Sequence, residues 1–178
     1  VAQLINELHT CQLDSSCYLD TLKRMDIPLR EFENYYSWNE ENYTRNCVFQ
    51  NELFEMLLIC FEKGQGSPIH DYDSHEAWIT VVQGKLREEK FRKHPKGRGL
   101  EKVSSVNLVP GDFTFISGQV GIHRYYNIFE NRSACLCLYA KPVERWKVYD
   151  EKTGDFTEKA VWYDRNPTDF SLEIEAVG

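Results

Sequence analysis

Apolar residues in the first part of the chain recur with the spacing of short amphipathic helices. Ser15 and Ser16 precede the second of these patterns and are expected to cap it, because a serine hydroxyl accepts a hydrogen bond from a free N–H of the first turn. Pro28 stands where a third helix would begin. We predict that residues 1–42 form a helical bracket with no chemistry of its own. The apolar faces are Leu4, Ile5 and Leu8, then Tyr18, Leu19, Leu22 and Met25, then Phe32 and Tyr36.

From Tyr43 onward the pattern changes to short apolar runs separated by turn residues, which is typical of a sandwich or barrel. No helical pattern separates the runs, so we expect antiparallel pairing. The chain predicts one structural domain, mainly all-β, with a barrel over residues 43–163. An acidic tail over residues 164–178 has few core residues and predicts a loosely docked strand. The predicted strands are Cys47–Gln50, Leu53–Phe61, Ala77–Val82, Leu86–Phe91, Lys102–Leu108, Phe113–Ile116, His123–Ile128, Ala134–Tyr139, Trp146–Tyr149 and Phe156–Tyr163.

The composition fits a folded domain and narrows the range of partners. With 178 residues, of which 42% are hydrophobic and 13% aromatic, the chain is long enough to bury its own core. The net charge of −7 argues against nucleic-acid binding, which needs a basic surface. The basic cluster at residues 90–98 is interrupted by Pro95 and Gly97, and it predicts an exposed hairpin loop.

The sequence shows neither a membrane segment nor a cysteine framework. No apolar run approaches the roughly 18 residues of a membrane-spanning helix, and the sequence as given opens without a secretory leader. None of the cysteines forms a C-x-x-C pair, which argues against a zinc site. We expect buried free thiols in a reducing compartment, and therefore a cytoplasmic protein, as a monomer. The six cysteines are Cys11, Cys17, Cys47, Cys60, Cys135 and Cys137.

Two of the five histidines stand out by their position. His70 and His123 each follow a bend that contains glycine, and each leads directly into the predicted barrel. His9 lies on a predicted helix and His94 in the basic loop, where we expect ordinary surface residues. Imidazoles at matching ends of two strand pairs are suited to bind a transition metal, so this pair predicts a metal site.

Several short motifs stand in a fixed order along the chain: Tyr43-Thr44-Arg45-Asn46, Ser67-Pro68-Ile69-His70-Asp71, Gln83-Gly84-Lys85-Leu86, Gly121-Ile122-His123-Arg124, Leu138-Tyr139 and Lys152-Thr153-Gly154. Their order and spacing resemble the two motifs of the cupin superfamily and, within it, the cysteine dioxygenase family. The resemblance covers Leu4 to Tyr163. It implies a cupin double-stranded β-helix barrel with a short α-helical N-terminal segment.

The resemblance also implies a thiol dioxygenase that uses Fe(II). His70 and His123 would be two of the three protein ligands of the iron, and L-cysteine and dioxygen would bind side by side at its open positions. Both oxygen atoms would add to sulfur, giving cysteine sulfinic acid. Arg45 would clamp the substrate carboxylate and Tyr43 would add a hydroxyl to it. Tyr139 would point its phenol at the bound substrate or oxygen.

The largest departure from the family pattern is Tyr72, which stands where a second histidine is expected. Residues i and i+2 of a strand share a face, so Tyr72 should point where His70 points. Three hypotheses follow: the phenolate binds the iron, or water, His75 or Glu76 completes the site, or metal binding and activity are lost. Without a bulge, the register counted back from Gly84 places Glu76 on the opposite face.

Two smaller departures concern the surroundings of Tyr139. Mammalian members of the family carry a thioether between a cysteine and the active-site tyrosine, and Ala77 occupies that cysteine position here, so the cross-link cannot form. This resembles the bacterial members. Cys135 and Cys137 share a strand face with Tyr139 and replace polar residues, which puts in question the polar relay that orients the phenol in the mammalian enzymes.

Other interpretations stay open on the sequence alone. A different small carboxylated thiol, such as 3-mercaptopropionate, is an alternative substrate, and Arg45 argues against cysteamine. Because of Tyr72, a non-catalytic small-molecule-binding cupin is a second alternative. Arg45 and Tyr43 also have plain structural interpretations, as a salt bridge and as packing between a strand and a helix.

Overall fold

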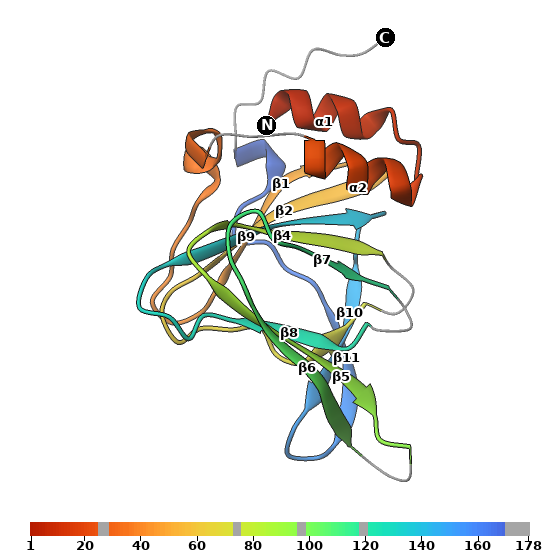
Figure 1. Ribbon diagram of the computed structural model, residues 1–178, viewed down its shortest axis with the longest axis vertical. Coiled ribbons are helices and arrows are strands. Elements are labelled where there is room, and N and C mark those ends of the chain that lie inside the picture. The colour runs from red at the N-terminus through yellow and green to blue at the C-terminus, as the bar shows by residue number, and fades with distance from the viewer. Residues whose placement is uncertain (25–28, 73–75, 96–98, 118–120, 170–178) are drawn as a thin grey trace.

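The computed structural model describes residues 1–24, 29–72, 76–95, 99–117 and 121–169. Within these residues, a helical layer lies on one face of a β-barrel (Figure 1). The helices are α1 (Ala2–His9), α2 (Ser15–Arg24) and the 3-10 helices η1 (Leu29–Tyr35) and η2 (Pro167–Asp169).

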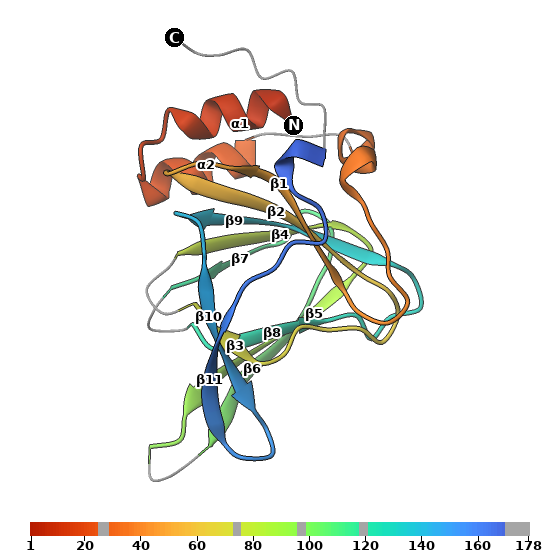
Figure 2. The same ribbon diagram turned by 180° about the vertical axis from the view of Figure 1, so that it is seen from behind.

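The helices α1 and α2 pack their apolar faces on the outer side of one sheet (Figures 1 and 2). The predicted helical faces are confirmed, since most of their members are buried in this core. Leu19 and Tyr36 pack at its edge. Met25 and Pro28 lie outside the described residues. The buried members are Leu4, Ile5, Leu8, Tyr18, Leu22 and Phe32.

The predicted cap of α2 is wrong, because the capping side chain belongs to Asp14. Its carboxylate accepts hydrogen bonds from the backbone N–H groups of Ser16, at 2.9 Å, and Cys17, at 3.3 Å. A carboxylate at a helix N-terminus also interacts favourably with the helix dipole. Ser15 is instead the first residue of the helix, and its hydroxyl donates to the carboxylate of Glu76.

The turn between α1 and α2 is closed by a disulfide bond that was not predicted from the sequence. Cys11 and Cys17 are bonded, and their Cα atoms lie 5.4 Å apart. Gln12 and Leu13 have positive φ angles of 48° and 70°, and this turn brings the two cysteines together. The prediction of six free thiols is therefore wrong for two of them. The free and buried thiols are Cys47, Cys60, Cys135 and Cys137.

The described strands form two antiparallel sheets that face each other (Figure 1), which confirms the predicted cupin double-stranded β-helix barrel. The first sheet has the order β1-β2-β9-β4-β7, and the second has the order β11-β10-β3-β8-β5-β6. The strands are β1 (Thr44–Gln50), β2 (Phe54–Phe61), β3 (His70–Asp71), β4 (Ala77–Gln83), β5 (Leu86–Lys93), β6 (Leu100–Leu108), β7 (Phe113–Ile116), β8 (His123–Tyr126), β9 (Ser133–Ala140), β10 (Arg145–Asp150) and β11 (Asp155–Ala160).

Two strands differ from the prediction in a way that matters for the site. The two-residue strand β3 was not predicted as an element of its own, because so short a strand leaves no periodic pattern. The last strand ends at Ala160 and not at Tyr163, because the chain leaves the second sheet there and runs to β1. Asp164 donates its backbone N–H to the carbonyl of Arg45 at 2.8 Å.

Strand β2 shows that the first sheet is covered on both faces. All of its residues are buried. Met56 and Leu58 belong to the core under the helices, whereas Leu57 and Ile59 belong to the barrel interior. Successive side chains on a strand point to opposite faces, so a sheet buried on both sides requires an unbroken apolar run. The helical layer and the barrel interior are thus two cores that share one sheet.

The start of the tail is fixed to β1 by backbone hydrogen bonds. The N–H of Cys47 donates to the carbonyl of Arg165 at 2.9 Å, and Asn46 and Arg165 form a parallel bridge. The carboxylate of Asp164 accepts from the N–H of Arg45 at 2.8 Å. Residues 170–178 lie outside the described chain, and the three-part division of the sequence stays a prediction.

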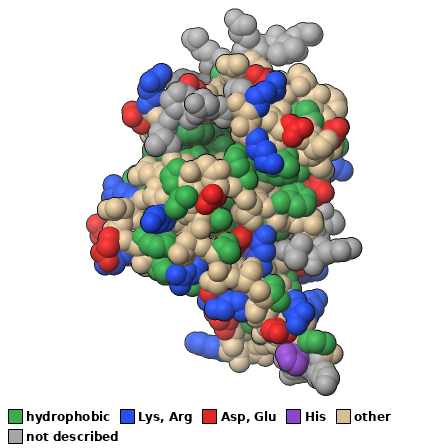
Figure 3. All heavy atoms as spheres, viewed as in Figure 1, with side chains coloured by type: hydrophobic (Ala, Val, Ile, Leu, Met, Phe, Trp, Pro, Cys, Tyr) green, Lys and Arg blue, Asp and Glu red, His purple; other side chains and the backbone are tan. Residues whose placement is uncertain are grey.

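The surface has a mixed charge pattern. Figure 3 shows acidic and basic side chains interspersed over one face of the molecule. In the β5–β6 hairpin, Arg92 pairs with Glu101 at 2.9 Å, so part of the basic cluster is matched by acid. Among the described helices, none is both long and apolar enough to cross a bilayer.

Gly66 is expected to be intolerant of any side chain. A Cβ atom at this position would lie 2.4 Å from the Cβ of Tyr126 and 2.9 Å from the carbonyl oxygen of Tyr125, both on β8. We expect Gly66→Ala to lower the free energy of unfolding by about 1–3 kcal/mol, the usual effect of overpacking, as measured by chemical denaturation.

Gly64 offers a matched control two residues earlier. It has a positive φ of 83°, and a Cβ atom added there would have no neighbouring atom within 4 Å. Gly64→Asn should cost less than about 1 kcal/mol, because asparagine tolerates this backbone conformation. Equal losses for the two variants would contradict the close approach of Gly66 to β8.

Candidate active site

The structure brings His70 and His123 together inside the barrel. The short strand β3 pairs with β8 through one register pair, His70 opposite His123. The two ring centroids lie 4.3 Å apart, and the side chains are 2% and 1% exposed. The sequence predicted that these two histidines form a pair, although their bends are far apart in the chain. The pairing of β3 with β8 makes the two histidines neighbours.

Both imidazoles are held in the same tautomer. The Nδ1 of His70 lies 2.8 Å from the carbonyl oxygen of Pro68, and the Nδ1 of His123 lies 2.5 Å from that of Gly121. A carbonyl only accepts hydrogen bonds, so each Nδ1 carries the proton and each Nε2 presents a lone pair. This is the arrangement found in histidines that bind metals through Nε2.

Both imidazoles are also kept neutral. The pKa of His123 is lowered to about 4, chiefly by burial. The hydrogen bond to the carbonyl of Gly121 acts against this lowering, and the charge of Lys90 contributes to it. Burial, followed by the neighbouring His123, lowers the pKa of His70 well below its ordinary value. Neutral imidazole is the form that binds metals, so no proton has to leave these two side chains at neutral pH.

Tyr72 lies one residue beyond β3 and points at the same place as His70. Its hydroxyl donates to the Nε2 of His70 at 2.9 Å and accepts from the hydroxyl of Tyr139 at 3.1 Å. Burial raises the pKa of Tyr72, and the charge of Arg45 and the hydrogen bonds from Tyr139 and Arg45 oppose this. Tyr72 therefore does share a face with His70, although the strand ends before it.

The donor types suit a metal ion, because imidazole nitrogens and a phenol oxygen are groups that bind transition metals. In the part of the chain that is described, no group of three or more His, Cys, Asp and Glu side chains is placed to hold a metal, and the Tyr72 phenol is a donor of another kind beside His70. The hydroxyl of Ser15 in α2 donates to Glu76, which is half-buried, and His75 lies outside the described residues.

Arg45 supplies a buried positive charge beside the two histidines. It is 1% exposed, and its Nε–H donates to the carbonyl of Trp162 at 3.1 Å. Its guanidinium lies over the rings of Trp146 and Trp162, 5.7 Å and 5.6 Å from their centroids. Among the described residues, no group accepts a hydrogen bond from its Nη2, and the Tyr43 hydroxyl likewise has no partner. Arg45 is therefore not held by a carboxylate of the described chain through that nitrogen.

Of these side chains, Tyr43, Arg45, His70 and Tyr72 line one small cavity with a volume of about 10 Å³. It has about the space of a single water molecule, so a substrate must displace side chains in order to enter. Tyr43 also lines a neighbouring pocket of about 520 Å³, together with Trp162 and Asp164. The small cavity is lined by Tyr43, Arg45, Ile59, Phe61, Ser67, His70, Tyr72, Tyr125, Cys137, Tyr139 and Trp146.

The surroundings of Tyr139 follow the register of β9. Ala77 lies directly opposite Tyr139 on β4, so the residue that faces this phenol across the ladder carries no thiol. Cys135 and Cys137 lie on the same inward face, with their sulfur atoms 3.8 Å apart. Burial raises the pKa of Tyr139 well above its ordinary value, as does the nearby Tyr72. The phenol thus keeps its proton at neutral pH.

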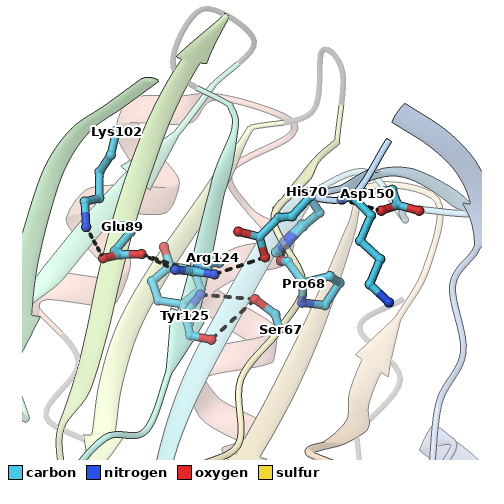
Figure 4. A network of polar contacts seen from close by, with 10 residues as sticks. Ser67, Pro68, His70, Glu89, Lys102, Arg124, Tyr125 and Asp150 are labelled. Atoms are coloured by element: carbon cyan, nitrogen blue, oxygen red, sulfur yellow. Dashed lines mark hydrogen bonds and ion pairs between the residues drawn. The ribbon is translucent and has the colours of Figure 1, made fainter. Parts of the chain in front are cut away.

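A polar network that begins at the cavity wall, with Ser67 and Tyr125, holds the bend that carries His70 (Figure 4). The Ser67 hydroxyl accepts from the N–H of Tyr125 at 3.1 Å. On the same strand, β8, Arg124 pairs with the buried Glu89 at 2.7 Å, and Glu89 also accepts from Lys102 at 2.8 Å. Strands β5, β6 and β8 are thereby fastened to one another, which fixes His123 relative to His70.

Sequence reasoning missed two contributors to the cavity. Trp146 and Tyr125 were each assigned only to a predicted strand. A signal existed in each case, because alternate residues of β8 and β10 face the barrel interior. Tyr125 donates to the buried carboxylate of Glu88 at 2.6 Å, so its hydroxyl is occupied.

The buried neutral histidines predict a loss of stability in mild acid. Their pKa values lie below the unfolded value of about 6.5, so between about pH 6.5 and pH 4 the unfolded chain binds more protons than the folded one. The stability of the metal-free protein should be complete above this window and should fall as the pH falls through it. Urea denaturation at a series of pH values measures the effect.

The control for this prediction is His123→Gln, which removes one of the two titrating groups. We expect a weaker dependence of the unfolding midpoint on pH in this variant. A midpoint that is constant across the window in the unmodified protein would contradict the burial of two neutral imidazoles.

Known proteins resemble this chain over most of its length. The family model for cysteine dioxygenase type I matches residues 2–152. Cysteine dioxygenase type 1 from Homo sapiens is 32% identical over 127 residues, which are 70% of this chain and 64% of that protein. Cysteine dioxygenase type 1 from Danio rerio is 27% identical over 157 residues, which are 82% of this chain and 77% of that protein. The match to the human protein thus spans slightly less than two thirds of its length.

A solved structure supports the fold. The crystal structure of TT1209 from Thermus thermophilus matches with a TM-score of 0.53 at 19% sequence identity, and covers 66% of this chain and 98% of that one. At this level of identity, the similarity concerns the fold alone. Since the family model covers most of the chain and includes both histidine bends, the chain belongs to the cysteine dioxygenase type I family of the cupin superfamily, a family of non-haem metal enzymes.

Proposed function

We propose that this protein is a thiol dioxygenase that oxidises L-cysteine with dioxygen to cysteine sulfinic acid, using Fe(II). The observation that carries the proposal is that His70, its register partner His123, the Tyr72 phenol and a buried arginine with an unpartnered N–H lie in one part of the barrel. Of these, His70, Tyr72 and Arg45 line one cavity, so metal donors and a carboxylate-binding group stand together, which is what a bidentate thiol substrate with a carboxylate requires.

His70, His123 and Tyr72 would hold the iron. The two imidazoles are pre-oriented by Pro68 and Gly121, so binding needs no rearrangement of their rings. When bound by these residues, ferrous iron would supply the chemistry that activates a thiol and dioxygen for reaction with each other. The overall reaction balances without another reductant, because the thiol sulfur loses four electrons and dioxygen gains four as both its atoms join the sulfur.

The chain's own residues bind and orient the substrate. Arg45 would clamp the carboxylate through its unpartnered Nη2, and the Tyr43 hydroxyl would add a second donor. Tyr139 keeps its phenol proton and donates it to the Tyr72 hydroxyl, and it would redirect this hydrogen bond to the reacting atoms when a substrate binds. The surrounding apolar side chains exclude water, which strengthens each of these interactions.

Every proposed ligand and substrate contact comes from one chain. A monomer is therefore sufficient for the proposed reaction, and no nucleic-acid or membrane partner enters it. Arg45 is the group that sets the substrate class, because its buried charge is best matched by an anion. L-cysteine and 3-mercaptopropionate both provide a carboxylate, whereas cysteamine does not.

The proposed activity is tested by oxygen uptake and sulfinate detection with iron-reconstituted protein. We expect L-cysteine to be oxidised fastest, 3-mercaptopropionate to be the alternative, and cysteamine to be the poorest of the three thiols. Arg45→Lys should raise KM for L-cysteine by about 10-fold or more, because lysine lacks the planar fork. Arg132→Lys, in an exposed pair with Glu62 and outside the cavity lining, is the matched control and should leave KM close to that of the parent.

Two results would overturn the proposal. Faster oxidation of cysteamine than of the two carboxylated thiols would contradict the proposed role of Arg45. Protein that retains no iron after reconstitution and forms no sulfinate would favour the second candidate function, a non-catalytic small-molecule-binding cupin. That candidate rests on Tyr72, which stands where the family has histidine.

Tyr72 as an iron ligand gives a separate prediction. The pKa of its phenol is raised, and the phenol must lose its proton in order to bind a metal ion. A neutral imidazole binds a metal ion without losing a proton. Tyr72→His should therefore bind iron more tightly, and the gain should be largest at low pH. The ferric parent should show a visible phenolate-to-iron charge-transfer band, which should vanish in the variant.

Tyr72→Phe is the control, because it keeps the ring and removes the donor. We expect it to lose both the band and most of the iron affinity, by about 10-fold or more. A parent protein with bound ferric iron and no such band would show that Tyr72 is not a ligand. Inductively coupled plasma analysis and absorption spectra give the two readouts.

A further inference from the structure

Trp146 brings an indole N–H to the cavity that none of the roles above explains. The side chain is 3% exposed, and it lines the same cavity as Arg45, His70 and Tyr72. Among the described residues, no group accepts a hydrogen bond from its Nε1. Buried N–H groups in native proteins nearly always have a partner, so an unpartnered one at a cavity points to an acceptor on a ligand.

The ring of Trp146 is fixed from several sides. It stacks at 16° on Tyr72, with centroids 6.2 Å apart, and it meets the ring of His70 edge-on at 4.8 Å. Trp162 packs against it at 5.7 Å, and the guanidinium of Arg45 lies over it. An indole held in this way is pre-organised, so a hydrogen bond from its N–H costs little conformational entropy.

Three unpartnered donors belong to residues that line this one cavity. They are the Nη2 of Arg45, the hydroxyl of Tyr43 and the Nε1 of Trp146. Arg45 and Trp146 are donors only, and Arg45 carries a full positive charge. A ligand that satisfies them must therefore present several acceptor lone pairs and a negative charge, which describes a carboxylate.

We propose that Trp146 is a specificity-determining residue, whose indole N–H donates to the carboxylate of the substrate alongside Arg45. This rests on the proposed thiol dioxygenase function and deepens it. The ring of Trp146 forms the wall against which the carboxylate lies, and its N–H completes a set of donors that a thiol without a carboxylate leaves unpaired. Selectivity for carboxylated thiols then comes from three donors and not from the arginine alone.

The first test compares Trp146→Phe with the parent in oxygen uptake. Phenylalanine keeps an aromatic wall and removes the N–H. Loss of one hydrogen bond to a charged group should raise KM for L-cysteine and for 3-mercaptopropionate by about 10-fold to 100-fold, with a smaller change in kcat. KM for cysteamine should stay within about 2-fold of the parent value, because cysteamine has no carboxylate that could accept a hydrogen bond from Trp146.

Trp78→Phe is the matched control. Trp78 is 2% exposed and belongs to the core under the helices, outside the cavity, so it undergoes the same chemical change in an equally buried place. Its KM values should follow those of the parent. Equal rises of KM for all three thiols in Trp146→Phe, or no rise for any of them, would overturn the proposal.

The second test needs neither iron nor activity. The chain has four tryptophans, so metal-free protein should give four indole N–H resonances in a nitrogen-15 spectrum. The resonance of Trp146 should move on addition of propionate and stay unmoved on addition of propylammonium at matched ionic strength. Trp38→Phe, Trp78→Phe and Trp162→Phe assign it by elimination, even if Trp146→Phe fails to fold.

The two tests separate the inference from the function on which it rests. If no thiol yields sulfinate while propionate moves the Trp146 resonance, the dioxygenase proposal fails and the carboxylate site stands. If sulfinate forms from L-cysteine while propionate leaves that resonance unmoved, Trp146 is only a wall of the cavity. A shift with propionate and with propylammonium alike would also overturn the role of the N–H.

Discussion

The candidate site depends on one backbone pairing, that of β3 with β8. It places His70 directly opposite His123, although the two residues lie on bends that are far apart in the chain. Neither bend would hold its histidine in place alone. The pairing is supported by Ser67, which binds the backbone of Tyr125, and by the salt bridges of Glu89 on the outer face. Polar contacts at the cavity wall and on the outer face thus fix the geometry of a mainly apolar interior.

The sheet that lies behind the site has two apolar faces, and it separates the core under the helices from the barrel interior. Residues of β2 alternate between the helical core and the barrel interior. In the interior, β9 contributes Tyr139 and the two thiols, and β1 contributes Arg45. The helices take part in the site only indirectly, through the contact of Ser15 with Glu76. The Cys11–Cys17 disulfide lies at the same end of α2.

Much of the fold was predictable from the sequence, because apolar periodicity reports which faces are buried. The helical faces, nearly all strands and the pair of histidines follow from that pattern and from the family resemblance. Three features did not follow. The strand β3 is too short to leave a pattern, and the disulfide depends on the turn at Gln12 and Leu13. Trp146 looks like an ordinary core residue until the pairing of distant strands places it beside Arg45 and His70.

Tyr72 follows β3 and lies outside the ladder that positions His70. No described strand pair includes Tyr72, so a change of side chain there leaves the pairing of His70 with His123 in place. Under the proposed function, the third donor can therefore change between nitrogen and oxygen while the two imidazoles stay where they are. Donor identity sets the charge and the redox potential of a bound metal. For the proposed reaction, the position after β3 is thus a tuning point, at which oxidation chemistry can be altered without a change of fold.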